Sequence, residues 1–213
     1  MPKQVDHRER REAIARALWR VVEQRGMAHA SVREVAEEAG ISHGAVQHYF
    51  ATRAEMLVFA MDFASEQTSQ RVAASVGKLG DPPHPRDMLR AMLVEMLPLH
   101  DDARATSRMS AAYVLEALHD ANIHTRARDG LKHGRDLVKR IVRQAIKEGH
   151  VSADRDPVTE TTLLLALTGL TPLLELTVIS PREALAAIDQ HLDRLFSRSV
   201  SAPTPAAPPA RGR

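Results

Sequence analysis

Apolar residues recur at helical spacing along almost the whole chain. No stretch combines strict apolar–polar alternation with enrichment in β-branched residues, as a half-buried strand would. Near the start, four apolar residues spaced by four, three and one positions fall on one face of a helix. These residues are Ile14, Leu18, Val21 and Val22. The pattern therefore predicts an all-α protein.

Helix starts and stops are closely spaced in the first 57 residues. Ser31, Ser42 and Thr52 each precede an apolar-periodic stretch and suit the N-cap position. Glu34 and Glu55, three residues after two of these caps, complete capping boxes. Glycines end the first two helices, at positions 26 and 40. The sequence thus predicts four helices here, joined by very short turns.

The remaining chain continues as helices separated by proline-containing segments. Asp156-Pro157 and Ser180-Pro181 are typical helix starts, with an N-cap residue followed by an N1 proline. Prolines at 82, 83 and 85 predict a loop, since they remove donors and clash with a preceding turn. In all we expect about nine helices, near residues 6–25, 31–40, 42–50, 53–76, 86–97, 103–119, 121–147, 158–179 and 182–198.

Residues 31–50 have the pattern of a helix-turn-helix unit, in which two helices flank a tight turn. Gly40 suits the positive φ that the turn requires. The positions expected to face inward are Val35, Ala36, Ala39, Ile41, Val46 and Tyr49. The positions expected to face outward on the second helix are Ser42, His43, Gly44, Gln47 and His48. In such units the second helix presents its first turns to the DNA major groove.

The outward residue types suit contacts with DNA. A glutamine can bond adenine through both amide groups, and histidine or serine can donate to base acceptors or phosphates. Gly44 would allow close backbone approach. The helix N-termini at Ser31, Ser42 and Thr52 offer N–H groups to phosphates, and Arg53 adds a positive charge. The alternative is that these polar residues merely solvate an exposed helix.

Residues 10–58, ending in "AVQHYFATRAEML", resemble the amino-terminal domain of the tetracycline-repressor (TetR) family of transcriptional regulators. The resemblance includes the Ser/Thr at position 31, Ala36, Gly40 and Phe50. Gln47 stands where the family most often has tyrosine, and Arg53 replaces the commoner lysine. The "QHYF" form is similar to the branch of betaine-pathway repressors. Because Gln47 departs from the family pattern, Tyr49 becomes our candidate for the phosphate contact, while Phe50 is expected to anchor the core.

The resemblance implies a three-helix DNA-binding domain over residues 1–52 and a larger helical domain for ligand binding and dimerisation over 53–198. It further implies a homodimer that binds a palindromic operator in double-stranded DNA and responds to a small-molecule effector of unknown identity, most often as a repressor. We expect the last two helices to form the dimer interface. Apolar residues there make a seam at Leu185, Ile188, Leu192 and Leu195. The alternative is that this seam packs within one subunit. The Pro/Ala-rich tail, 199–213, is expected to be disordered.

Candidate residues for an effector pocket are adaptable methionines, aromatic residues and two carboxylates. They are Phe59, Phe63, Met92, Met96, Met109, Tyr113, Glu116 and Glu175. Core packing explains most of them equally well, and Glu175 is more simply expected to reach a polar partner. Beyond residue 63 the aromatic residues are Tyr113 and Phe196, too few for a cage around a quaternary ammonium. The basic residues of 126–150 are more simply a solvated face than an anion site.

Composition narrows the remaining possibilities. The chain has no cysteine, which excludes disulfides, thiolate zinc sites and cysteine nucleophiles. Its net charge is only +2, so any affinity for nucleic acid must come from local geometry. The charged start lacks a secretory h-region, and the apolar run 161–174 favours a buried helix over a membrane span, so we expect a cytoplasmic protein. We find no catalytic motif and expect neither enzyme activity nor a cofactor or metal. A purely structural dimer would leave the helix-turn-helix pattern unexplained.

Overall fold

The computed structural model describes residues 2–197, with side chains from residue 7 on. Within this part of the chain the structure contains α-helices and two short 3-10 helices and no strand, which confirms the all-α prediction. The elements are α1 (Pro2–Arg25), η1 (Met27–His29), α2 (Val32–Ala39), α3 (His43–Tyr49), α4 (Arg53–Val76), α5 (Pro85–Glu95), α6 (Asp101–Ala117), α7 (Ala121–Lys147), α8 (Pro157–Ala166), η2 (Leu167–Leu170), α9 (Thr171–Glu175) and α10 (Pro181–Phe196). The tail expected to be disordered lies outside the described residues.

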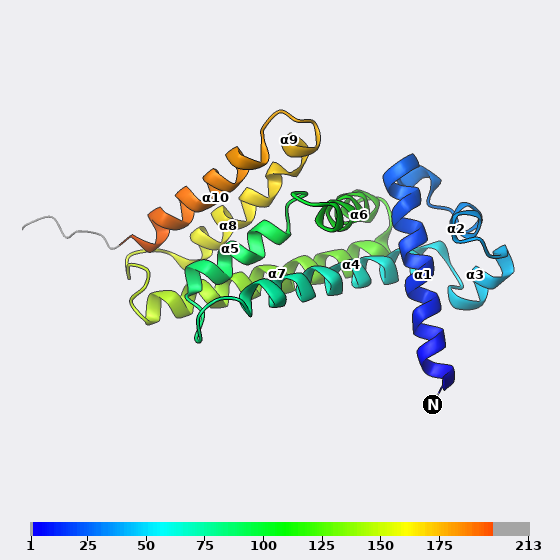
Figure 1. Cartoon of the computed structure of the whole chain (residues 1–213), viewed down its shortest axis with the longest axis horizontal. Helices are drawn as coiled ribbons and strands as arrows, with labels where there is room; N and C mark the ends of the chain where they lie inside the picture. The colour runs from blue at the N-terminus through cyan, green and yellow to red at the C-terminus, as the bar shows by residue number, and fades with distance from the viewer. Residues whose placement is uncertain (1, 198–213) are drawn as a thin grey trace, which may run out of the picture.

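Helices α1 to α3 gather at one end of an elongated molecule, and α4 to α10 form the body (Figure 1). Helix α4 leaves the small end and runs into the body beside α7, while α6 crosses next to α1. Helices α8 and α10 lie on the opposite side of the body from α4. The arrangement is consistent with a small domain mounted on a larger helical one.

Local capping explains most helix boundaries. Asp120 accepts hydrogen bonds from the N–H groups of Asn122 and Ile123 at 2.8 and 3.0 Å, which starts α7 where the sequence predicts it. Ser180 and Glu183 form a full capping box at α10, and Pro181 occupies N1. These contacts satisfy N–H groups that a helix leaves free at its start. Short-range chemistry therefore sets the lengths of these helices.

The single helix expected over 158–179 is divided into α8, η2 and α9. Pro172 has no N–H and its ring clashes with the carbonyl four residues earlier, at Thr168. The hydroxyl of Thr168 instead donates to the carbonyl of Leu165 at 2.7 Å, and that of Thr171 donates to Thr168 at 3.1 Å. The helix consequently tightens into a 3-10 turn before it ends.

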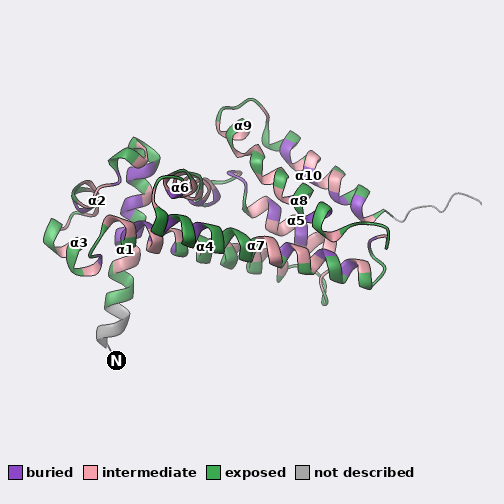
Figure 2. Ribbon diagram, turned by 180° about the vertical axis from the view of Figure 1, so that it is seen from behind, coloured by how far each residue is buried: buried purple, intermediate pink, exposed green. Residues whose placement is uncertain are grey.

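Two apolar clusters form the core, and buried residues make stripes on the inner faces of the helices (Figure 2). The first cluster joins α1 to α3 with the first half of α4, α6 and the start of α7. The second joins α5, the end of α7, α8 and α10. Between them lies a polar layer, in which Arg71 donates to Glu95 and to Thr106, at 2.9 Å each. The small domain is thus packed onto the near half of the body.

The predicted seam on the last helix packs inside one subunit. Ile188, Leu192 and Leu195 are buried in the second cluster, and Leu185 is half-buried. The expectation that these side chains meet a partner is therefore wrong, since α5, α8 and η2 of the same chain pack against α10. Any dimer contact of α10 must use its outer face.

Residues Pro157–Glu175 are, by length and composition, apolar enough to cross a membrane. The sequence pattern predicts a buried helix here, but only 17% of this stretch is buried. Helix α8 lies at the outside of the body and buries one narrow stripe, consisting of Glu160, Thr161 and Leu164. Leu165 is partly buried against the second cluster, while Val158 and Leu163 are exposed.

Candidate nucleic-acid interface

The helix-turn-helix geometry depends on a tight turn between α2 and α3. Gly40 has φ 67°, in the left-handed region where a side chain is strained, and its N–H donates to the carbonyl of Glu37 at 3.2 Å. Ala36 is 2% exposed, and its carbonyl accepts from the N–H of Ile41 at 3.1 Å. A small residue and a glycine therefore let α3 cross α2 closely.

Helix α3 divides into a buried side and a fully exposed side. Val46 is 0% exposed and anchors the buried side in the first cluster. The residues of α3 and its cap that are exposed are Ser42, His43, Gly44, Gln47 and His48. The five polar or small positions expected to face outward are thus brought to one continuous surface. The positions expected to face inward are buried or half-buried.

Each predicted N-cap hydroxyl is present and engaged. The hydroxyls of Ser31, Ser42 and Thr52 accept from the N–H three residues later at 3.2, 3.1 and 3.0 Å. Neither glutamate completes its predicted box. The carboxylate of Glu34 binds the ring of His29 and the Ser31 hydroxyl, which lowers the pKa of Glu34. The carboxylate of Glu55 accepts from the N–H of Ala51 at 3.0 Å instead of from that of Thr52. The caps leave other N–H groups of each first turn directed outward, toward the solvent side of the helix start.

Tyr49 and Phe50 have different environments at the end of α3. Phe50 is 1% exposed, with its ring centroid 5.4 Å from that of Phe59 and the guanidinium of Arg11 4.7 Å above it. Tyr49 is half-buried and packs against His7 of α1, with ring centroids 5.0 Å apart. Phe50 therefore anchors the core as expected, while Tyr49 remains at the surface.

Arg53 is not directed toward the α3 surface. Its guanidinium donates to the carbonyls of Ala30 at 2.9 Å and Met27 at 3.3 Å, and it forms an ion pair with Glu116 of α6. The role predicted for it, a phosphate contact, is replaced by a link between η1, α4 and α6. The sequence signal for this link was absent, because Glu116 lies 63 residues further along the chain.

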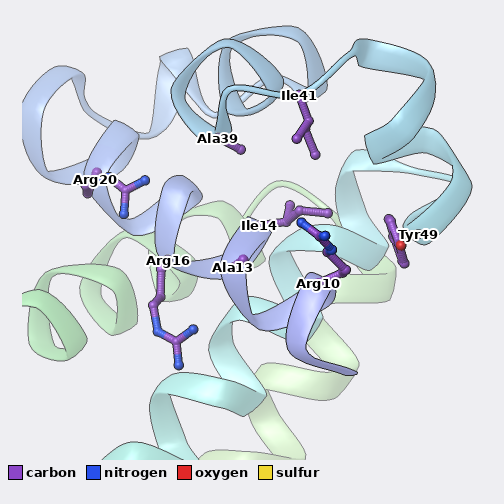
Figure 3. A pocket seen from close by; sticks show the side chains of 8 residues that line it. All are labelled: Arg10, Ala13, Ile14, Arg16, Arg20, Ala39, Ile41 and Tyr49. Atoms are coloured by element: carbon purple, nitrogen blue, oxygen red, sulfur yellow. The ribbon is translucent and has the colours of Figure 1, made fainter. Parts of the chain in front are cut away.

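A pocket of about 240 Å³ lies between α1 and the α2–α3 unit (Figure 3). Its lining consists of Arg10, Ala13, Ile14, Arg16, Arg20, Ala39, Ile41 and Tyr49. Arg16 and Arg20 are paired with Glu12 and Glu38, at 3.3 and 2.6 Å. Arg10 and Tyr49 stand near the same end of the pocket, beside α3 (Figure 3). The pocket therefore places the side chain of Arg10 near the half-buried Tyr49.

The candidate effector residues are not gathered into one site. Four of them, Phe59, Phe63, Met109 and Tyr113, belong to the first cluster. Met92 packs on the second, and Met96 is 40% exposed. Glu116 is paired with Arg53, and Glu175 with Arg108 of α6 at 2.5 Å. Tyr113 and Phe196 lie in different clusters, so they do not form a cage.

The chain matches two family descriptions. Residues 14–58 match "Bacterial regulatory proteins, tetR family", and residues 85–197 match "BetI-type transcriptional repressor, C-terminal". Together these matches include the helix-turn-helix unit and most of the helical body.

Individual relatives are transcriptional regulators of the helix-turn-helix type. PksA of Bacillus subtilis (strain 168) is 38% identical over 140 residues, which are 65% of this chain and 66% of PksA. BetI of Stenotrophomonas maltophilia (strain R551-3) is 38% identical over 93 residues, 44% of this chain and 46% of BetI. The chain thus spans from about half to just under two thirds of the length of these relatives.

Solved structures of other transcriptional regulators share the fold of this chain. A transcriptional regulator from Rhodococcus sp. Rha1 has a TM-score of 0.73 at 26% identity, covering 87% of this chain and 95% of that one. A regulator from Saccharomonospora viridis in complex with choline has a TM-score of 0.70 at 23% identity, covering 87% and 94%, and supports the fold alone. With the domain matches over residues 14–58 and 85–197, these likenesses show that the chain belongs to the TetR family of transcriptional regulators.

Proposed function

We propose that the chain is a homodimeric, ligand-responsive transcriptional repressor of the cytoplasm, which binds a palindromic operator and is released by a small-molecule effector. The observation that carries the proposal is the surface of α3, where every outward position is polar or glycine and is exposed. The operator, in this view, is double-stranded DNA, and the protein acts by occupying it rather than by catalysing a reaction.

Base recognition is assigned to the "QHYF" helix α3, and above all to His43, Gln47 and His48. Their side chains are exposed on consecutive turns of a short helix whose opposite side is fixed by Val46. A rigid helix presents such side chains to base edges at defined spacing, and glutamine is suited to adenine. Gly44, with nothing within 4 Å of where a Cβ would stand, leaves room for the close approach of DNA.

Phosphate contacts are assigned to the first turns after Ser31, Ser42 and Thr52 and to the hydroxyl of Tyr49. Free N–H groups and the positive ends of helix dipoles favour anions at these places. Affinity for the DNA backbone can therefore arise although the net charge is only +2.

Dimerisation is assigned to the outer faces of α8 and α10, the two long helices nearest the C-terminal end of the described chain. On α8, Val158 and Leu163 are 39% and 46% exposed. On α10, Ala186 and Gln190 lie one turn apart on the exposed side. Two such faces related by a two-fold axis would pack as four helices and bury this apolar surface.

Effector binding is assigned to the helical body, where α7 is incompletely covered. Ala127 and Val138 of its inner stripe are buried, but Leu131 between them is 60% exposed. The glycine on the same stripe, Gly134, has nothing within 4 Å of a built Cβ. Solvent therefore reaches this stripe of α7 between Ala127, which belongs to the first cluster, and Val138, which belongs to the second.

The direct test is selection of bound duplexes from a random DNA pool by the purified protein, followed by sequencing. We expect enrichment of a palindrome whose half-sites lie about one helical turn, roughly 34 to 36 Å, apart. Binding to it should weaken steeply with salt. Absence of enrichment at low salt, from protein shown by circular dichroism to be helical, would contradict the proposal. A reporter whose expression falls when the gene is deleted would contradict repression alone.

A further inference from the structure

The turn between α8 and α10 carries an exposed apolar surface. We call residues 171–179, made of α9 and the loop after it, the α9 corner. Leu173, Leu176 and Val178 are 38%, 72% and 65% exposed, so three large apolar side chains point outward within six residues. Surface of this kind is disfavoured in water unless another molecule covers it.

The α9 corner is held in one conformation. The carbonyl of Leu173 accepts from the N–H of Val178 at 2.8 Å, and Thr177 donates to Leu174 at 3.1 Å. Thr177 has φ 56°, in the left-handed region that a β-branched residue rarely adopts. On the inner side, Leu174 and Ile179 pack against the second cluster. The exposed side chains are therefore presented by a strained, fixed turn rather than by a loose loop.

The α9 corner is also tied to the small domain by one guanidinium. Glu175 accepts from Nε and Nη2 of Arg108 on α6, at 3.0 and 2.5 Å. Nη1 of the same arginine donates to Glu23 of α1 at 3.1 Å. The other oxygen of Glu175 is buried without a hydrogen bond, 4.0 Å from Nε of Arg104. A displacement of α9 must therefore either break the contact between Arg108 and Glu175 or move Arg108 relative to Glu23 of α1.

We propose that the α9 corner is a contact surface for a second copy of this chain, and that Arg108 makes the position of α1 depend on that contact. The proposal rests on the homodimer proposed above and extends its interface beyond α8 and α10. It gives Arg108 the role of a positioning residue, since it acts through Glu23 and not on DNA.

A second copy is the occupant that the surface fits best. The α9 corner continues directly from α8, whose Leu163 and Val158 are also exposed, so one partner face would cover both. The carboxylate of Glu175 is turned inward and paired, which leaves the outward side of the corner apolar. An isologous contact places the same apolar turn of each copy against the other copy, and such burial favours association.

The contact is tested by sedimentation velocity on the full chain. The double variant Leu176→Asp/Val178→Asp is expected to raise the dimer dissociation constant about tenfold or more, through lost apolar burial and unpaired charge. The matched control is Leu115→Asp/Leu118→Asp on α6, whose leucines are 64% and 66% exposed. Circular dichroism establishes that both variants fold. An unchanged constant in the corner variant, or an equal rise in the control, would overturn the proposal.

The link to α1 is tested by hydrogen–deuterium exchange of the peptide containing Glu23. We expect faster exchange in Arg108→Met and in the corner variant, and no change in Arg128→Met, whose side chain pairs with Asp129 on its own helix. Wild-type exchange in Arg108→Met would overturn the link. A wild type that sediments as a monomer would contradict the proposed homodimer and this contact together. A wild type that dimerises yet selects no DNA would contradict the proposed function and leave the corner contact supported.

Discussion

Arg53 in the first turn of α4 forms an ion pair with Glu116 of α6, while the same guanidinium donates to the carbonyls of Ala30 and Met27. One side chain thus joins the turn before α2, the start of α4 and the last turn of α6. It lies where the sequence suggested a phosphate contact, but its hydrogen bonds are internal. We therefore expect Arg53 to affect DNA binding through the orientation of the small domain rather than through a phosphate contact.

Replacing Arg53 by methionine should lower the free energy of unfolding by about 1–2 kcal/mol, given the strength of hydrogen bonds to charged groups and its partial exposure. Operator affinity should fall on all sequences, whereas the slope of affinity against salt should stay unchanged. Removing a true phosphate contact would reduce that slope by about 1. Arg33→Met, at a side chain 82% exposed, is the control. A reduced slope for Arg53→Met would show that Arg53 contacts a DNA phosphate after all.

Gln47→Ala should alter sequence preference rather than general affinity. If the exposed amide bonds one base bidentately, its loss costs about 1–3 kcal/mol at that half-site position and little elsewhere. Competition titrations with operators changed at single positions would measure this cost. Gln24→Ala, at an exposed glutamine of α1, should leave every preference unchanged. An unaltered preferred sequence in the Gln47 variant would show that the assignment of the α3 face is wrong.

Tyr49→Phe should weaken binding to all duplexes alike, since a hydroxyl on a phosphate carries no sequence information. The ring contact with His7 would remain, so the change isolates one hydrogen bond, worth about 0.5–1.5 kcal/mol. Operator and random duplexes titrated in parallel give the comparison. The other tyrosine, Tyr113, is 3% exposed in the body, and its phenylalanine variant should bind DNA like wild type without effector. A loss confined to the operator would point to a base contact instead.

Helix boundaries could be predicted from the sequence because their causes are local. Ser42 and Asp156 cap helices through atoms two or three residues away, so a short window contains the whole interaction. The outward face of α3 was also predictable, because a seven-residue helix with one buried valine leaves few alternatives. Pro172 also indicates an interruption of the helix expected over 158–179, but the apolar residues around it continue at helical spacing, so the pattern predicts one unbroken helix.

Contacts between distant segments could not be predicted in this way. The periodicity of Ile188 and Leu192 is the same whether the partner belongs to the same chain or to another, so the pattern left both open. The directions of Arg53 and Arg108 depend on carboxylates 63 and 67 residues away. The sequence shows that each arginine carries a charge. Which carboxylate it pairs with depends on how α6 lies relative to α1, α4 and α9 in the folded chain.

Acid should weaken the attachment of α5 to α10. Arg90 donates to both oxygens of Asp189, at 2.6 and 3.1 Å, and these hydrogen bonds hold the pKa of Asp189 below its usual range. The folded protein therefore favours the ionised carboxylate. Its contribution to stability is present above the unfolded pKa of about 3.9 and is lost as the pH falls through the lower folded value.

Asp189→Asn should accordingly be less stable than wild type at pH 7, and the difference should shrink below about pH 4. Urea unfolding at a series of pH values measures it. The control is Asp129→Asn, where an exposed aspartate pairs with the adjacent Arg128. A difference that stays constant down to pH 2 would mean that the substitution acts through packing rather than through charge.

Alanine substitutions at the two glycines of the helix-turn-helix should have different effects on the stability of the fold and on operator affinity. Gly40 has φ 67°, so Gly40→Ala should destabilise the fold by about 1 kcal/mol. Gly44 lies within α3 with open space around it, so Gly44→Ala should stabilise the helix by about 0.5–1 kcal/mol. Its methyl would nevertheless stand on the surface assigned to DNA, and operator affinity should fall. Urea unfolding and operator titration of both variants give the four values needed. Wild-type affinity in Gly44→Ala would mean that DNA does not approach this part of α3 closely, and the docking of the helix would have to be revised.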